Sequence, residues 1–307
     1  MEQSRTREES ARRIGPYRLI TRLDPPSPPG PAVPCRRFIA RTQDGERTVL
    51  LSVPLPGADP VRFATEADAA RRLLGPWVAP VTDLADPADP AVPGETPWYA
   101  TPYVPALPLP VALAVHGGPL PEPTVRAVGA ALAEALAAAH AQGLTHAGVS
   151  PAAVLLTADG PRLSCFGAVR AAGADGEART GLPGLDPGAL APEQASGGRP
   201  RPPGDVFALG AVLAYAATGH TVPERDELPP ALRPVVSSCL ARDPADRPTA
   251  AALMTALAPP TTHGTVLNSA GTLLAPGWLP GRVVAALARQ SSELLAAELP
   301  TDTTSRT

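Results

Sequence analysis

The pattern of the chain changes near Pro105, and this change limits the fold more than any other feature. Over residues 14–103, short apolar stretches such as YRLITRL, RRFIAR and RTVLLSV alternate with turn signals, which is typical of strands. One helix interrupts them at 59–74, with Asp59 as its N-cap. After Pro105 the pattern is helical. The sequence therefore predicts an α+β fold in which a small β-rich lobe with one helix precedes a larger helical lobe, with a cleft between them.

The helical part begins with an Ala-rich helix at 122–143 that ends at Gly143, and two short strands follow it. The longest apolar run, VFALGAVLAYAATG at 206–219, is too short to cross a membrane and predicts a buried core helix. Two shorter helices are expected at 229–240 and 249–257.

Composition excludes several classes of function. All 26 basic residues are Arg, so no mechanism can use a Lys amine, and the net charge of −3 gives no basic surface for nucleic acid. The three cysteines lie far apart and predict neither a disulfide framework nor a zinc site.

The N-terminus lacks the apolar core that a signal peptide would have. We expect a cytoplasmic protein with no membrane span, and a solvated Arg36-Arg37 pair.

Four motifs follow one another in a recognisable order. They are HAGVSPAAVLL at 146–156, ALAPEQA at 189–195, DVFALGAVLAYAATG at 205–219 and DPADRPTA at 243–250. In this order they resemble the bacterial Ser/Thr protein kinase family of the actinobacterial type, and the resemblance covers roughly 15–257. The resemblance implies a protein-kinase-like fold of two lobes.

The same resemblance implies the domain organisation. We expect a disordered N-terminus at 1–13 and a kinase-like domain at 14–258. Its N-lobe would span 14–104 and its C-lobe 105–258. The remaining residues, 259–307, are expected to form a linker and a C-terminal amphipathic helix.

The resemblance also indicates which catalytic groups are missing. The base Asp of a kinase catalytic loop corresponds to Gly148, the loop Lys to Ser150, and the Mg²⁺-binding Asn to Ala153. The metal-binding Asp of the D-F-G motif corresponds to Cys165, whose neutral thiol is a poor ligand for Mg²⁺. The Lys of the V-A-I-K strand corresponds to Ser52. No catalytic residue and no metal are therefore expected.

The phosphate-binding loop is equally altered. Its segment reads DPPSPPGPAVP at 24–34, in which each Pro removes a backbone N–H and only Gly30 remains as a glycine. The nucleotide cleft would be lined by Gly30, Leu50, Ser52, Glu66 and Leu155. We expect no cofactor, with ATP bound without a metal as the alternative. Glu66 is expected to be solvated or paired with an Arg, and an Arg that replaces the missing Lys remains an open alternative.

The retained residues are architectural. The resemblance predicts stacking of His146 on Phe166, which precedes Gly167, and an ion pair between Glu193 and Arg247. Asp205 is expected to accept backbone N–H bonds from the catalytic-loop turn. His146 is interpreted as a satisfied core histidine.

These substitutions favour a catalytically inactive kinase homologue, a pseudokinase, that acts in signalling by binding a protein partner such as an active kinase or its substrate. The alternative is a nucleotide-binding or weakly active kinase with a rewired site, in which Asp159 or Asp186 moves near the cleft. We interpret Cys165 as a small buried apolar residue in preference to a redox sensor.

The tail contains an amphipathic pattern at 279–299. Val283, Val284, Leu287, Leu294 and Leu295 are expected to lie near one side of a helix. Docking on the helical lobe of the same chain is the favoured interpretation, and binding of a partner is the alternative.

Overall fold

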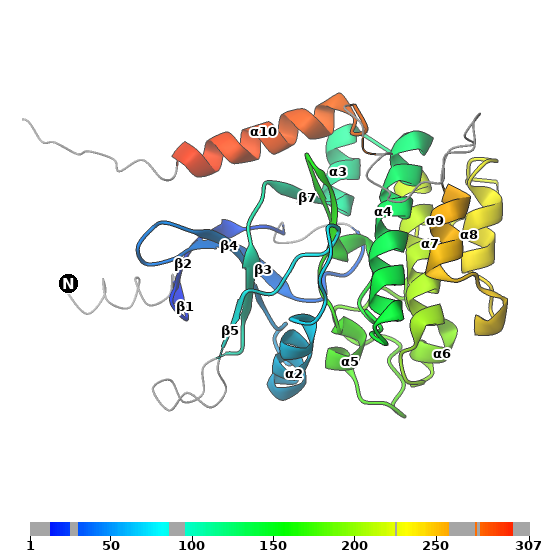
Figure 1. Cartoon of the computed structure of the whole chain (residues 1–307), viewed down its shortest axis with the longest axis horizontal. Coiled ribbons are helices and arrows are strands. Elements are labelled where there is room, and N and C mark those ends of the chain that lie inside the picture. The colour runs from blue at the N-terminus through cyan, green and yellow to red at the C-terminus, as the bar shows by residue number, and fades with distance from the viewer. Residues whose placement is uncertain are drawn as a thin grey trace, which may run out of the picture.

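The computed structural model describes residues 13–24, 30–85, 96–224, 226–257, 274 and 277–296. It has the predicted two-lobed α+β architecture, with a sheet beside a larger group of helices (Figure 1). The predicted disordered N-terminus and most of the predicted linker lie outside the described residues, but Arg13 belongs to a strand. Among the described residues, no helix is long and apolar enough to cross a membrane.

The N-lobe is a six-stranded antiparallel sheet with the strand order β1-β2-β3-β4-β6-β5. Its strands are β1 (Arg13–Ile14), β2 (Tyr17–Arg22), β3 (Arg36–Arg41), β4 (Thr48–Val53), β5 (Asp83–Leu84) and β6 (Tyr99–Pro102). Helix α2 (Pro60–Ala70) packs beside this sheet, and the Asp59 carboxylate caps it by accepting the N–H groups of Val61 and Arg62. The helix ends at Ala70, four residues earlier than predicted.

The C-lobe begins with a small sheet of β7 (Ala106–Pro108), β8 (Val154–Thr157) and β9 (Gly160–Leu163). Its helices are α3 (Leu109–His116), α4 (Glu122–Ala141), η1 (Pro151–Ala153), α5 (Ala168–Ala172), α6 (Pro192–Ala195), α7 (Pro202–Thr218), α8 (Arg233–Cys239), η2 (Pro244–Asp246) and α9 (Ala250–Leu257). Helix α10 (Gly281–Ala296) runs along the upper edge of the view in Figure 1. Helix α3 was not predicted, because Pro108 and Pro110 at its start resemble a helix-breaking signal, although proline is tolerated in the first turn of a helix.

The core of the C-lobe is built around α4 and α7, whose side chains are buried from Val206 to Ala217 except for Phe207. At Gly129 in α4, an added methyl group would lie 2.7 Å from Leu213 of α7 and 2.8 Å from Leu257 of α9. The glycine therefore allows these three helices to approach closely. This packing gives a rigid base for the loops that follow α4.

Glu193 of α6 and Arg247 form a bidentate ion pair with N–O distances of 2.7 and 2.9 Å. The Arg247 side chain has no exposed surface, whereas that of Glu193 is 32% exposed. Arg247 also donates to the carbonyl groups of Ala241, Arg242 and Pro203. The pair joins the segment before α7 to the loop before α9.

Candidate functional site

The turn at 146–148 is held by one carboxylate. Asp205, in the first turn of α7, accepts the backbone N–H groups of His146 and Ala147, each at 2.7 Å, and lies 2.9 Å from Nε2 of His140. Ala147 has a φ of 50°, which most L-residues avoid. The bonds to Asp205 hold the turn in this conformation.

His146 is buried and packs edge-to-face on Phe166, with ring centroids 5.5 Å apart. Neither of its ring nitrogens has a hydrogen-bond partner among the described residues. The histidine is therefore a core residue, but its polar atoms are not satisfied as the sequence analysis had assumed. Burial lowers its pKa to about 4 and outweighs the opposite effect of Asp205, so the ring is neutral at pH 7.

At Gly148, which the resemblance assigns to the position of the kinase base, the backbone leaves no room for a side chain. The segment after β9 is drawn against the turn by two bonds, from Gly167 N to the His146 carbonyl at 2.8 Å and from Val169 N to the Ala147 carbonyl at 2.7 Å. A methyl group at Gly148 would overlap the carbonyl oxygen of Cys165 and lie 3.1 Å from Ala168 N. No residue larger than glycine fits without a shift of the backbone.

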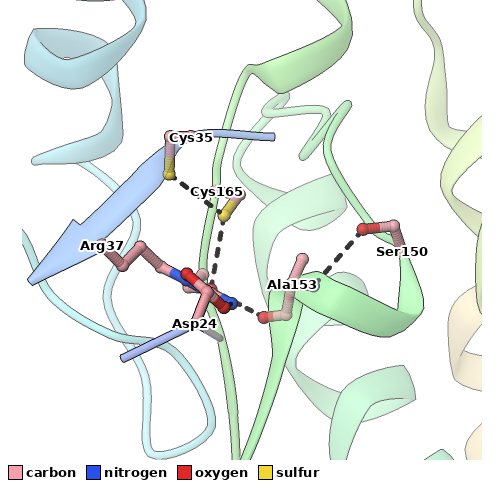
Figure 2. Close-up of polar contacts among 7 residues, drawn as sticks. Asp24, Cys35, Arg37, Ser150, Ala153 and Cys165 are labelled. Atoms are coloured by element: carbon pink, nitrogen blue, oxygen red, sulfur yellow. Dashed lines mark hydrogen bonds and ion pairs between the residues drawn. The ribbon is translucent and has the colours of Figure 1, made fainter. Parts of the chain in front are cut away.

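The positions that would bind Mg²⁺ offer no suitable donors. Ala153 is fully buried, and its carbonyl accepts the N–H and the hydroxyl of Ser164. The Ser150 hydroxyl caps η1 by accepting Ala153 N at 3.3 Å (Figure 2). No group of three or more His, Cys, Asp or Glu side chains is placed to hold a metal in the part of the chain that the structure describes. The residues present do not fit Mg²⁺.

A buried ion pair lies between the lobes, beside Ser164. Arg37 of β3 is opposite Ser52 of β4 in the sheet, and its guanidinium donates to both carboxylate oxygens of Asp24 at 2.5 and 2.9 Å (Figure 2). It also donates to the Ser164 hydroxyl at 3.3 Å. Arg37 is completely buried, so the expectation of a solvated Arg36-Arg37 pair was wrong for this residue. The charge of Arg37 therefore lies on β3, next to strand β4, where Ser52 stands in place of the expected Lys. Asp24 neutralises this charge.

Glu66 of α2 is paired with an Arg, although not with one from the sheet. Its carboxylate accepts Nε and Nη2 of Arg170 in α5 at 2.8 and 2.7 Å. Arg170 also donates to the Thr145 carbonyl and lies over the Phe166 ring. Gly167 has a φ of 74°, and a methyl group there would overlap Glu66. The helix is thus held against the segment that follows Cys165.

The thiols of Cys35 and Cys165, close to the Arg37–Asp24 ion pair, are in contact with each other. Cys35, directly before β3, and Cys165, after β9, have sulfur atoms 3.8 Å apart (Figure 2). Both side chains are buried, and Cys165 has a φ of 62°. Sequence analysis gave no signal for this contact, because the two residues are 130 positions apart.

An apolar cavity of about 140 Å³ lies beside the segment that connects the lobes. Of the five residues predicted to line a nucleotide cleft, Leu50 and Leu155 line this cavity, together with Leu23, Thr101 and Tyr103 among others. Ser52, Gly30 and Glu66 do not line it. A methyl group at Gly30 would lie 3.8 Å from the Tyr215 hydroxyl and 3.9 Å from Pro110, so this glycine faces the C-lobe.

Of the two carboxylates considered for a rewired site, Asp159 is exposed in the turn between β8 and β9. Asp186 is buried and accepts Gly188 N at 2.8 Å. It shares a cavity of about 20 Å³ with Gly148 and Ser150. This volume is enough for about one water molecule.

Helix α10 docks on its own chain and reaches both lobes. Arg282 donates to the His116 carbonyl of α3 at 3.3 Å, and the Gln290 side chain accepts Ala106 N at 2.9 Å. Leu294 joins the apolar cluster that also contains Leu23, Ile39, Leu50, Ala106 and Leu155. The helix therefore contributes to the apolar cluster that borders the cavity.

Three of the five residues predicted for one side of α10 are buried, and the other two are exposed. Val283, Ala286, Leu287 and Leu294 are buried, whereas Val284 and Leu295 are 48% and 61% exposed. Each step along a helix rotates the side chain by about 100°, which turns Val284 and Leu295 away from the contact.

Comparisons with known proteins find serine/threonine-protein kinases that are similar in sequence. The chain is 38% identical over 267 residues to the probable serine/threonine-protein kinase PkwA of Thermomonospora curvata, covering 80% of this chain and 34% of that protein. It is 35% identical over 299 residues to the serine/threonine-protein kinase AfsK of Streptomyces coelicolor, covering 90% and 35% respectively. The chain thus spans about a third of the length of these curated relatives.

Solved structures show the same fold. The crystal structure of the Mycobacterium tuberculosis PknI kinase domain matches with a TM-score of 0.58 and 25% identity, and the match covers 80% of this chain and 96% of that domain. No protein-family model matches the chain.

The buried neutral His146 makes stability depend on pH. In the unfolded chain its pKa is near 6.5, and in the folded protein about 4, so the unfolded state binds the proton first as the pH falls. The stabilisation is complete above about pH 6.5 and is lost between pH 6.5 and pH 4. From pH 7 to pH 5 we expect His146 to lower the free energy of unfolding by about 2 kcal/mol. Urea unfolding of the wild type and of His146→Phe, which cannot titrate, measures this difference; equal pH dependence of the two would contradict it.

The contact of Leu294 can be tested against its neighbour Leu295. We expect Leu294→Asp to lower the free energy of unfolding by about 2 kcal/mol or more, because it buries a carboxylate among apolar side chains, and to increase amide exchange in α10. Leu295→Asp, at an exposed position, should change it by less than about 0.5 kcal/mol. Equal effects of the two substitutions in urea unfolding and hydrogen exchange would show that α10 does not pack through Leu294.

Proposed function

The chain belongs to the actinobacterial Ser/Thr protein kinase family, and from this premise we propose that it is a member that does not transfer phosphate and acts in signalling by binding a protein partner. The observation that carries the proposal is the closure of the backbone at Gly148. A missing side chain can be replaced by a neighbouring one, but here the carbonyl of Cys165 occupies the space that a base would need.

The rest of the site supports the same proposal. Phosphoryl transfer depends on placing metal ions and cations around the transferred group. Cys165 and Ala153 provide neither of the metal-binding oxygens, and the guanidinium of Arg37 is already paired with Asp24. A nucleotide phosphate would have to displace that carboxylate from a buried position. Removal of members of a catalytic unit leaves little of its rate.

A kinase-like domain that lacks catalytic groups can still bind other proteins through its surface. The structural contacts of Asp205, Glu193 and Arg247 are present, which supports a folded domain maintained for binding. Val61 of α2 is 72% exposed and Leu74, shortly after the helix, is 65% exposed. Val61 belongs to the helix that carries Glu66, and Leu74 follows this helix by four residues, which favours this part of the N-lobe for a protein partner, an active kinase or its substrate.

One observation favours a second candidate function, the binding of a nucleotide without metal. The cavity of about 140 Å³ beside Thr101, Tyr103 and Leu155 is apolar and remains open. A flat aromatic base could enter it without using the metal positions. In this alternative Leu294 of α10 limits access, because its cluster borders the cavity.

Phosphate transfer and nucleotide binding are tested together. We expect the full chain to transfer no labelled phosphate from ATP to a general protein substrate, and to show no change in Tm with millimolar ATP and Mg²⁺. A ligand at 100 times its Kd stabilises the folded state by about 2.7 kcal/mol, which such a measurement detects.

The control for transfer is the triple variant Ser52→Lys, Ala153→Asn and Cys165→Asp, which restores three family residues but leaves Gly148 closed, and it should remain inactive. A rise in Tm with ATP in EDTA would support the second candidate. Transfer of phosphate by the wild type would overturn the proposal.

Partner binding is tested with substitutions on the proposed surface. We expect Val61→Asp combined with Leu74→Asp to abolish the cross-linked complexes that the full chain forms with kinases or their substrates in an actinobacterial cell. Val222→Asp is the matched control, because Val222 is 76% exposed and belongs to the C-lobe. Mass spectrometry of the cross-linked proteins measures the result. Loss of the same complexes in both variants, or in neither, would contradict the proposed surface.

A further inference from the structure

The contact between Cys35 and Cys165 joins the two lobes. Cys35 precedes β3 in the N-lobe, and Cys165 follows β9 in the C-lobe, so a covalent bond between them would cross the cleft. The two sulfur atoms are 3.8 Å apart and both side chains are buried. We propose that Cys35 and Cys165 form a reversible disulfide that locks the lobes together under oxidising conditions. This inference does not depend on whether the protein transfers phosphate.

The surroundings of Cys165 favour its thiolate. Its sulfur lies 3.5 Å from the Ser164 hydroxyl, which in turn accepts a hydrogen bond from the buried guanidinium of Arg37. The contact with the Cys35 thiol lowers the pKa of Cys165, burial opposes this, and the charge of Arg37 lowers it further. The same contact and burial raise the pKa of Cys35. One sulfur is thus poised as the nucleophile and the other as the proton-bearing partner.

A small oxidant has space at this contact. A cavity of about 30 Å³ is lined by both cysteines, together with Glu66, Tyr99 and Phe63 among others. A water molecule needs about 10–15 Å³ measured in this way, so a molecule of the size of water or hydrogen peroxide fits. The backbone of Cys165, in the left-handed region at a φ of 62°, turns its side chain toward Cys35.

The chemistry requires a peroxide and two thiols. The Cys165 thiolate attacks one oxygen of hydrogen peroxide, the O–O bond breaks, and hydroxide leaves and takes up a proton as water, giving a sulfenic acid. The Cys35 sulfur then attacks the sulfenic sulfur, the S–S bond forms, and the hydroxyl leaves as water with the proton of the Cys35 thiol. One peroxide is reduced to two waters, and two thiols are oxidised to one disulfide. A dithiol reductant reverses the bond by thiol–disulfide exchange.

A disulfide between Cys35 and Cys165 would hold together the segments on the two sides of the cleft. Cys35 is two residues before Arg37, which pairs with Asp24, and Cys165 is five residues before Arg170, which pairs with Glu66. A disulfide at this place therefore ties the strand that carries the buried cation to the segment that holds α2. Separation of the lobes would require reduction first.

Cys239 provides an internal control. It is fully buried in α8, burial raises its pKa to about 12, and its Cβ lies against Gly210 of α7. Because no other described cysteine is in contact with it, it should remain reduced when the other two are oxidised. The proposed bond would leave one free thiol in the full chain, whereas general oxidation would leave none.

The experiment titrates the reduced full chain with hydrogen peroxide and counts free thiols after denaturation. We expect the count to fall from three to one, and peptide mapping to find a peptide that links Cys35 with Cys165. Closing so long a loop should raise Tm by roughly 5–10 °C, and dithiothreitol should reverse the rise. The Cys239→Ser variant should keep the shift, whereas Cys35→Ser and Cys165→Ser should lose it.

Three results would overturn the proposal. They are three free thiols at peroxide concentrations that oxidise free cysteine, a sulfinic acid at Cys165 with no linked peptide, or a linkage between two chains on a non-reducing gel. Peptide mapping of the wild type decides the matter even if a serine variant fails to fold.

Discussion

The structure around the site depends on the hydrogen bonds that Asp205 accepts from the turn at His146 and Ala147. Two backbone N–H groups buried without partners would each cost about 1–3 kcal/mol, and one carboxylate satisfies both. Because Asp205 lies in the first turn of α7, its negative charge also suits the helix N-terminus. The core helix and the turn are therefore one unit. The position of Gly148, and with it the closure against Cys165, follows from this unit.

The charges of the site are satisfied within the protein. Arg37 pairs with Asp24, Arg170 with Glu66, and Arg247 with Glu193. The second and third pairs join segments 104 and 54 residues apart in the chain, and each of the three cations also donates to other oxygens. Removing one partner from such a pair leaves a buried charge unpaired. An active site usually contains a cation or carboxylate that is free to bind the substrate. In this cleft, Arg37, Arg170 and Glu66 are each paired with an oppositely charged residue. The charges of these three residues are therefore neutralised within the protein.

Helix α10 and the Cys35–Cys165 contact both connect the two lobes, so both oppose their separation. The helix contacts α3 through its first half and contributes Leu294 to a cluster that includes N-lobe strands. The thiols meet near the buried ion pair of the cleft. Movement of one lobe would disturb both contacts, so the closed arrangement of the lobes and the docking of the helix support each other.

The sequence by itself determined the two-lobed α+β fold, most of its strands and long helices, and the identity of the residues at the kinase positions. Those features depend on local periodicity, on caps such as Asp59 and on the order of short motifs. It did not determine that Arg37 is buried, that Cys35 meets Cys165, or that Val284 faces solvent while Ala286 packs. Each of these depends on how segments more than a hundred residues apart come together, and an Arg or a Cys has the same local pattern whether it is solvated or enclosed. Even at Gly148, the sequence indicated that the base is missing, but only the tertiary structure decided that the backbone has closed over its place.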